Sequence, residues 1–127
     1  MTTELFLLIL SRLVEALREF ENAKREITSY NRADTVNMSP NEMNHFRHIA
    51  ASAYLIKRGF SEFEVELLGN MKEIGDFCRK FTWSDADFDK QNNKKGIRIG
   101  KQHRYAGQKD IFDFIFKTEI EPLRKRF

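Results

Sequence analysis

The sequence of 127 residues contains a single cysteine, Cys78, and an internal disulfide bond is therefore excluded. It also lacks an apolar run of the roughly 20 residues that a membrane-spanning helix needs. The apolar run at residues 5–10 follows Glu4 rather than a basic segment, and no small-residue cleavage site comes after it. We therefore expect neither a signal peptide nor a transmembrane span.

The composition is typical of one folded domain. Hydrophobic residues make up 41% and charged residues 32% of the chain, a balance that excludes wholesale disorder. Because a chain of this length leaves little room for a second core, we expect a single domain over residues 1–127. The 12 phenylalanines predict a core that is rich in large, flat side chains.

The positive charge is concentrated at the C-terminal end. Residues 94–127 hold 10 Lys and Arg against 4 Asp and Glu, a net charge of +6, whereas residues 1–93 hold 12 against 15. Such a segment can bind nucleic acid or another anionic surface. A solvated helix face has the same composition, so both interpretations stay open.

The first periodic segment predicts a long helix from about Glu4 to Ser29. Its large apolar residues are spaced by threes, fours and a seven: Phe6, Leu10, Leu13, Leu17, Phe20 and Ile27. The leading interpretation of this stripe is packing onto the helix's own domain. Pairing with a second copy or with another protein is the alternative.

Two capping boxes predict the next two helices. Residues 39–42, Ser-Pro-Asn-Glu, combine an N-cap serine, a first-turn proline and a glutamate that caps in return, so a helix should begin at Pro40. Residues 57–59, Lys-Arg-Gly, should end it. Residues 61–64, Ser-Glu-Phe-Glu, repeat the pattern and predict a third helix to about Lys80.

The remaining chain predicts a short fourth helix from Ser84 that stops before Gly96, an irregular glycine-rich segment at 96–107, and a last helix from about Gln108. The fold class expected is therefore all-α, a compact bundle of four to five helices. Within the single domain we distinguish the long N-terminal helix at 1–30, a core at 39–100 that carries the motifs, and a basic C-terminal helix at 101–127.

Metal binding finds little support in the sequence. His45 and His48 lie three residues apart on one predicted helix, but no third ligand of a zinc pattern accompanies them. The run from Asp85 to Gly96 has Asp at alternate positions like a calcium loop, but it has Lys90 where that loop needs glycine and ends on Gly96 instead of a glutamate. We expect no metal and no cofactor.

A carboxylate between two glycines is the strongest candidate for chemistry. Glu73 lies between Gly69 and Gly75 in the predicted third helix, where each glycine costs about 1 kcal/mol relative to alanine. One explanation is that another backbone packs closely there. The other is that the small residues form a cleft beside Glu73, whose carboxylate would act as a general acid or base.

Three polar motifs follow one another along residues 44–100: Phe46-Arg47-His48, Gly69-Asn70 with Lys72-Glu73, and Asp89-x-x-Asn92-Asn93-x-x-Gly96 with Gly100. Their order resembles an uncharacterised family of small helical domains found in bacteriophage genomes and at the ends of some bacterial secreted proteins. The resemblance implies a virion or tail-associated protein, with polar groups arranged like the site of a cell-envelope hydrolase. This chain departs from the family in having Lys72 and Lys90 where histidine is common.

The leading expectation is a phage virion component, tail or ejection associated, that docks through its N-terminal helix and resides in the virion or the host cytoplasm. The alternative is a peptidoglycan-cleaving hydrolase, with Glu73 and His48 as catalytic residues and Arg47 helping to bind substrate. Asp89, Asn92 and Asn93 would complete that binding site. A second alternative is a module that binds nucleic acid through the basic C-terminal segment.

Overall fold

The computed structural model describes residues 2–33, 37–69 and 83–125, and of residues 32, 33 and 83–89 only the backbone. Helix α1 (Thr3–Ala33) is longer than predicted. Its buried face carries small residues as well as large ones, namely Ala16, Ala23, Ile27 and Tyr30. The expected packing of the large residues onto the domain is wrong in the N-terminal half of the helix, because Phe6, Leu10 and Leu17 are exposed.

Helix α2 (Pro40–Lys57) is the centre of the structure and has both predicted ends. The Ser39 side chain accepts from the Glu42 amide, and the Glu42 carboxylate accepts from the Ser39 amide, which confirms the capping box. Gly59 follows the helix with a φ of 97°, a left-handed conformation that favours glycine. Apart from His48, which is half-buried, and Arg47, which is exposed, residues 45–56 are buried, because the other helices surround α2.

A helical segment at residues 62–69 follows the second capping box, which is also confirmed. Arg12 of α1 donates two hydrogen bonds to the Glu64 carboxylate, from Nε at 2.8 Å and from Nη2 at 3.1 Å. These bonds to Arg12 lower the pKa of Glu64 to about 2. The two contacts hold the segment against α1. The rest of the predicted third helix, including Glu73, lies outside the described residues.

Helix α4 (Trp83–Gln102) runs straight through the predicted irregular segment. The predicted stop before Gly96 is therefore wrong, and the irregular chain is limited to residues 103–107. The reason is tertiary. A Cβ atom on Gly96 would lie 2.2 Å from the Ile49 carbonyl oxygen of α2, and one on Gly100 would lie 2.9 Å from that of Ala53. The glycines let two helix backbones touch, a benefit that outweighs their low helix propensity.

The C-terminal chain continues as α5 (Gln108–Ile115), the π-helical turn η1 (Phe116–Ile120) and α6 (Glu121–Lys125). The predicted start at Gln108 is confirmed. Pro122 does not end the helix. In a regular α-helix its ring would crowd the carbonyl of Thr118, and the wider π turn directly before it gives the ring room.

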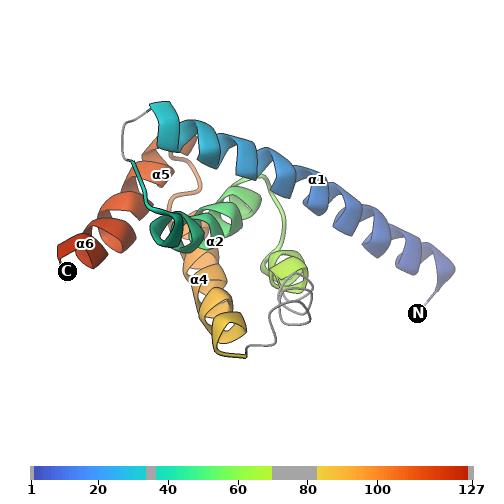
Figure 1. Cartoon of the computed structure of the whole chain (residues 1–127). Coiled ribbons are helices and arrows are strands. Elements are labelled where there is room, and N and C mark those ends of the chain that lie inside the picture. Colours follow the sequence, from blue (N-terminus) through green and yellow to red (C-terminus); the bar gives the residue numbers. More distant parts are fainter. Residues whose placement is uncertain (1, 34–36, 70–82, 126–127) are drawn as a thin grey trace.

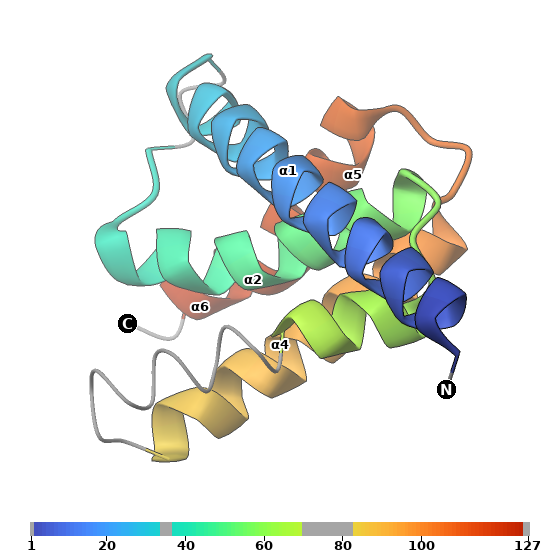
Figure 2. The ribbon, with the colours of Figure 1, turned by 90° about the vertical axis from the view of Figure 1, so that its right-hand side faces the viewer.

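The core lies around α2, and the all-α prediction is confirmed. Tyr30 of α1, Phe46 of α2 and Phe112 of α5 pack with ring centroids 5.4 to 5.7 Å apart. Helix α1 crosses the bundle, and its N-terminal end extends past the other labelled helices (Figures 1 and 2). The described part of the chain contains no strand, and none of its helices has the length and apolarity needed to cross a membrane.

Replacing Gly96 by alanine tests the contact between α2 and α4. In an open helix the change would stabilise by about 1 kcal/mol. Here we expect the free energy of unfolding to fall by about 2 kcal/mol or more, because the new methyl group overlaps the Ile49 carbonyl. Urea denaturation measures the change. Gly107→Ala is the control, since its Cβ would meet only Asp110 at 3.5 Å. Equal effects of the two changes would contradict this account.

Candidate functional site

The structure brings two of the three predicted motifs to the same helix pair. Arg47 and His48 lie on α2, and Asn92 and Asn93 lie on α4, its main packing partner. Asp89 is also on α4, but its side chain, like all of Glu73, lies outside what the structure describes. The predicted catalytic pair of Glu73 and His48 is therefore not placed by the structure.

The most buried polar contact joins Asn92 to His45, a residue that sequence reasoning considered only as a metal ligand. Asn92 is 1% exposed and His45 is 8% exposed. The Asn92 side-chain amide donates to His45 Nδ1 at 3.1 Å. This bond requires the neutral imidazole to carry its proton on Nε2. Asn92 therefore fixes the tautomer of a buried histidine, and its side chain is enclosed by the described residues.

Two charged residues complete this polar cluster, and sequence reasoning missed both. Glu119 of η1 places Oε2 3.9 Å from His45 Nε2, and the same oxygen pairs with Lys95 Nζ of α4 at 3.3 Å. Burial lowers the pKa of His45, repulsion from Lys95 lowers it further, and Glu119 opposes both. This polar cluster connects α2, α4 and η1 through the neutral imidazole of His45. Its members are His45, Asn92, Lys95 and Glu119.

The other predicted binding residues do not join this cluster. Arg47 is exposed and forms no ion pair within the described part of the chain. Asn93 accepts a hydrogen bond from the Ser52 hydroxyl at 3.5 Å and lines a small surface hollow with Glu66, Lys90 and Lys94. A Cβ on Gly69 would lie 2.7 Å from the Asn93 amide nitrogen. Asn93 thus fills the space beside Gly69, so close packing explains that glycine.

The largest feature without a partner in the described structure is apolar. Seven large hydrophobic residues of the first half of α1 are 44 to 61% exposed: Leu5, Phe6, Leu7, Leu8, Leu10, Val14 and Leu17. Four of them, Leu7, Leu10, Val14 and Leu17, form a row that we call the outer stripe. Because the α-helix repeats every 3.6 residues, this stripe points away from the face that buries Ala16 and Ala23.

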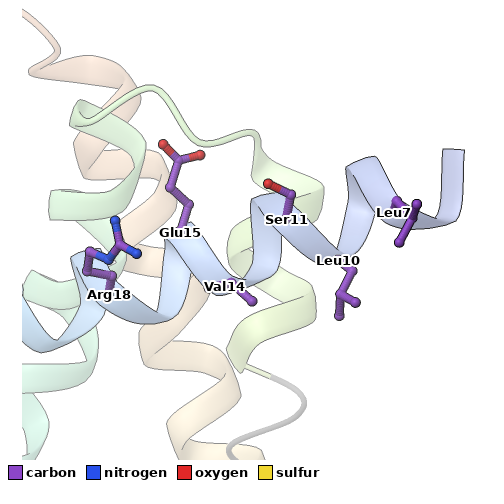
Figure 3. Close-up of a pocket in the computed structure, with 6 residues that line it drawn as sticks. All are labelled: Leu7, Leu10, Ser11, Val14, Glu15 and Arg18. Carbon is purple, nitrogen blue, oxygen red and sulfur yellow. The ribbon is translucent and has the colours of Figure 1, made fainter. Parts of the chain in front are cut away.

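The outer stripe ends abruptly along α1. The same face of the helix continues with Glu21, Arg25 and Thr28, all exposed. Figure 3 shows the first half of the helix: Leu10 and Val14 project on one side, Ser11 and Glu15 on the other, and Arg18 lies towards the second half. Single exposed apolar residues are ordinary on protein surfaces, whereas a contiguous patch of this kind is a candidate interaction site.

No group of three or more His, Cys, Asp or Glu side chains is placed to hold a metal ion among the residues whose side chains are described. His45 has its Nδ1 occupied by Asn92. The chemistry available at the polar cluster is therefore proton binding by the imidazole.

The polar cluster predicts a pH dependence of stability. Folding lowers the pKa of His45 below the value of about 6.5 that a histidine has in the unfolded chain. Such a histidine stabilises the fold at pH values above its unfolded-state pKa, and this stabilisation is lost as the pH falls through its folded-state pKa. We expect the free energy of unfolding to drop between pH 7.5 and 5.5. In His45→Gln the drop should be smaller. The measurement is urea denaturation at both pH values.

His103→Gln is the control, because His103 lies outside the cluster, against Phe114. It should keep the wild-type pH dependence. If His45→Gln and His103→Gln alter the pH dependence equally, the cluster is not its source.

Comparison of the chain with protein-family models, with curated proteins and with solved structures found no match. The resemblance of residues 44–100 to the phage and bacterial helical domains stays a prediction from its motifs.

Proposed function

We propose that this chain is a structural component of a larger assembly and that it docks there through the exposed apolar half of α1. The observation that carries the proposal is the outer stripe, four large residues half exposed on a face that the chain's own core does not use. Covering a half-exposed side chain of this size stabilises a complex by about 1 kcal/mol.

The assembly that we propose is a phage particle, with the chain associated with the tail or the ejection apparatus. The support for this part is the motif resemblance over residues 44–100, in a family whose phage members look like virion proteins. The docking helix lies outside the resembling region, which suits a shared domain that individual proteins attach to different structures.

The two alternatives draw less support from the described residues. A peptidoglycan hydrolase would depend on Glu73, which lies outside them, and Asn92 is committed to His45. A nucleic-acid module would need free cations in the C-terminal segment. Three of the ten cations at residues 94–127 form ion pairs with carboxylates, which reduces the positive charge that is open to a partner: Lys95 with Glu119, Lys101 with Glu62, and Arg124 with Glu42.

Sedimentation of cell extracts tests the proposal. In the organism or infected host that produces it, the C-terminally tagged chain should sediment with an assembly much larger than the 15.1 kDa chain or a few copies of it. Leu10→Glu combined with Val14→Glu should abolish this, because two charges would be buried in the contact.

Thr28→Glu combined with Ser29→Glu is the matched control. It adds the same charge to the exposed surface of the same helix, beyond the outer stripe. It should sediment like the wild type. Wild-type protein that sediments no faster from extracts than after purification would contradict the proposal.

A further inference from the structure

We propose that the outer stripe is covered by a second copy of this chain, whose α1 packs against it in antiparallel orientation about a two-fold axis. This inference rests on the proposed docking role of α1 and names the partner that meets the helix directly. The dimer would be the unit that the larger assembly takes up, and Leu5 and Leu8, which are exposed on α1 but lie off the outer stripe, would remain open for that contact.

The spacing of the outer stripe is that of a two-stranded helix seam. Leu7, Leu10, Val14 and Leu17 follow one another by three, four and three residues, which places them at the a and d positions of a heptad. All four are exposed, and the chain's own core contacts lie on the other side of the helix. A second helix can therefore approach the stripe while the two domains stay on the outside of the pair.

The stripe is complementary to itself when the second helix is reversed. In a two-fold interface every contact occurs twice: if residue i of one copy contacts residue j of the other, residue j of the first copy also contacts residue i of the second. Leu7 then faces Leu17 of the second copy, and Leu10 faces Val14 of the second copy. Every layer of the seam is filled by two large apolar side chains. The outer stripes of the two copies overlap over their whole length, because the first residue of each stripe lies opposite the last residue of the other.

Charge selects this orientation. Glu4 and Arg18 occupy equivalent positions beside the seam, and the antiparallel register brings Glu4 of each copy next to Arg18 of the other. Both side chains are exposed, and neither forms an ion pair within the described part of the chain. Flanking charges of opposite sign set the orientation of paired helices, and each dimer would hold two such pairs.

A parallel pair lacks these advantages. Continuing the seam in register would set Glu21 against Glu21 and Lys24 against Lys24 of the second copy, because these residues occupy the next a and d positions. In the parallel pair Phe6 would face Ser11 of the second copy, and Leu13 would face Arg18 of the second copy. Arg18 would then have no acidic residue across from it. The antiparallel register avoids both faults.

The mass of the purified full-length chain in solution is the first test. Light scattering should give twice 15.1 kDa for the wild type and for the control Thr28→Glu. In the antiparallel register Thr28 lies beyond the N-terminal end of the α1 helix of the other copy. Leu10→Glu should give the monomer mass with unchanged helical circular dichroism. Arg18→Glu should raise the dimer dissociation constant roughly tenfold, and adding Glu4→Arg should restore it, because the pairs reform with reversed sign.

Cross-linking fixes the orientation. In a Cys78→Ser background, copies with Leu7→Cys are mixed with copies with Leu17→Cys and treated with a short bismaleimide. The antiparallel dimer cross-links the mixture but neither protein alone, because identical positions lie about 15 Å apart along the helices, at a rise of about 1.5 Å per residue. A parallel dimer would give the opposite pattern.

A wild-type monomer, or cross-links only between identical positions, would overturn the inference. Neither result bears on the sedimentation of cell extracts, where a monomer can still join a large assembly through the outer stripe. Conversely, a purified antiparallel dimer that stays a dimer in extracts would uphold the inference and contradict the proposed function.

Discussion

The close approach of α2 and α4 is the contact on which the rest of the structure depends. Three pairs of residues meet at intervals of one helical turn along both helices: His45 with Asn92, Ile49 with Gly96, and Ala53 with Gly100. The helices therefore run in the same direction where they touch, with their i, i+4 rows in register. The two glycines bring the backbones together, and this distance allows the Asn92 amide to reach the imidazole one turn earlier.

Local signals were predictable from the sequence. Both capping boxes, the left-handed glycine after α2 and the start of α5 at Gln108 depend on residues within a few positions of one another, and the structure confirms them. The extension of α4 through Gly96 and Gly100 was not predictable in this way. Glycine is a poor helix former on its own, and only the facing carbonyls of α2 show why it is required there.

The same limit applies to the sites. Motif order grouped Arg47, His48, Asn92 and Asn93 into one candidate site, and the structure has them on two helices that pack together. It missed that the partner of Asn92 is His45, 47 residues away, and it did not include Lys95 or Glu119. On α1, alternation of large residues suggested a buried seam, whereas alanines face the core and several of the leucines face outward. Periodicity shows that a face exists, but the tertiary contacts decide which face is covered.

The anchoring of α1 has a consequence for how its N-terminal half is ordered. The second half of the helix is locked into the core by Ala23, Ile27 and Tyr30, so a helical nucleus is always present. Each residue of the first half then adds a hydrogen bond without the cost of starting a helix. A free peptide of the same sequence would have to form that nucleus while it binds. As part of this domain, the segment is already helical before it binds its partner. Less conformational entropy is therefore lost on association.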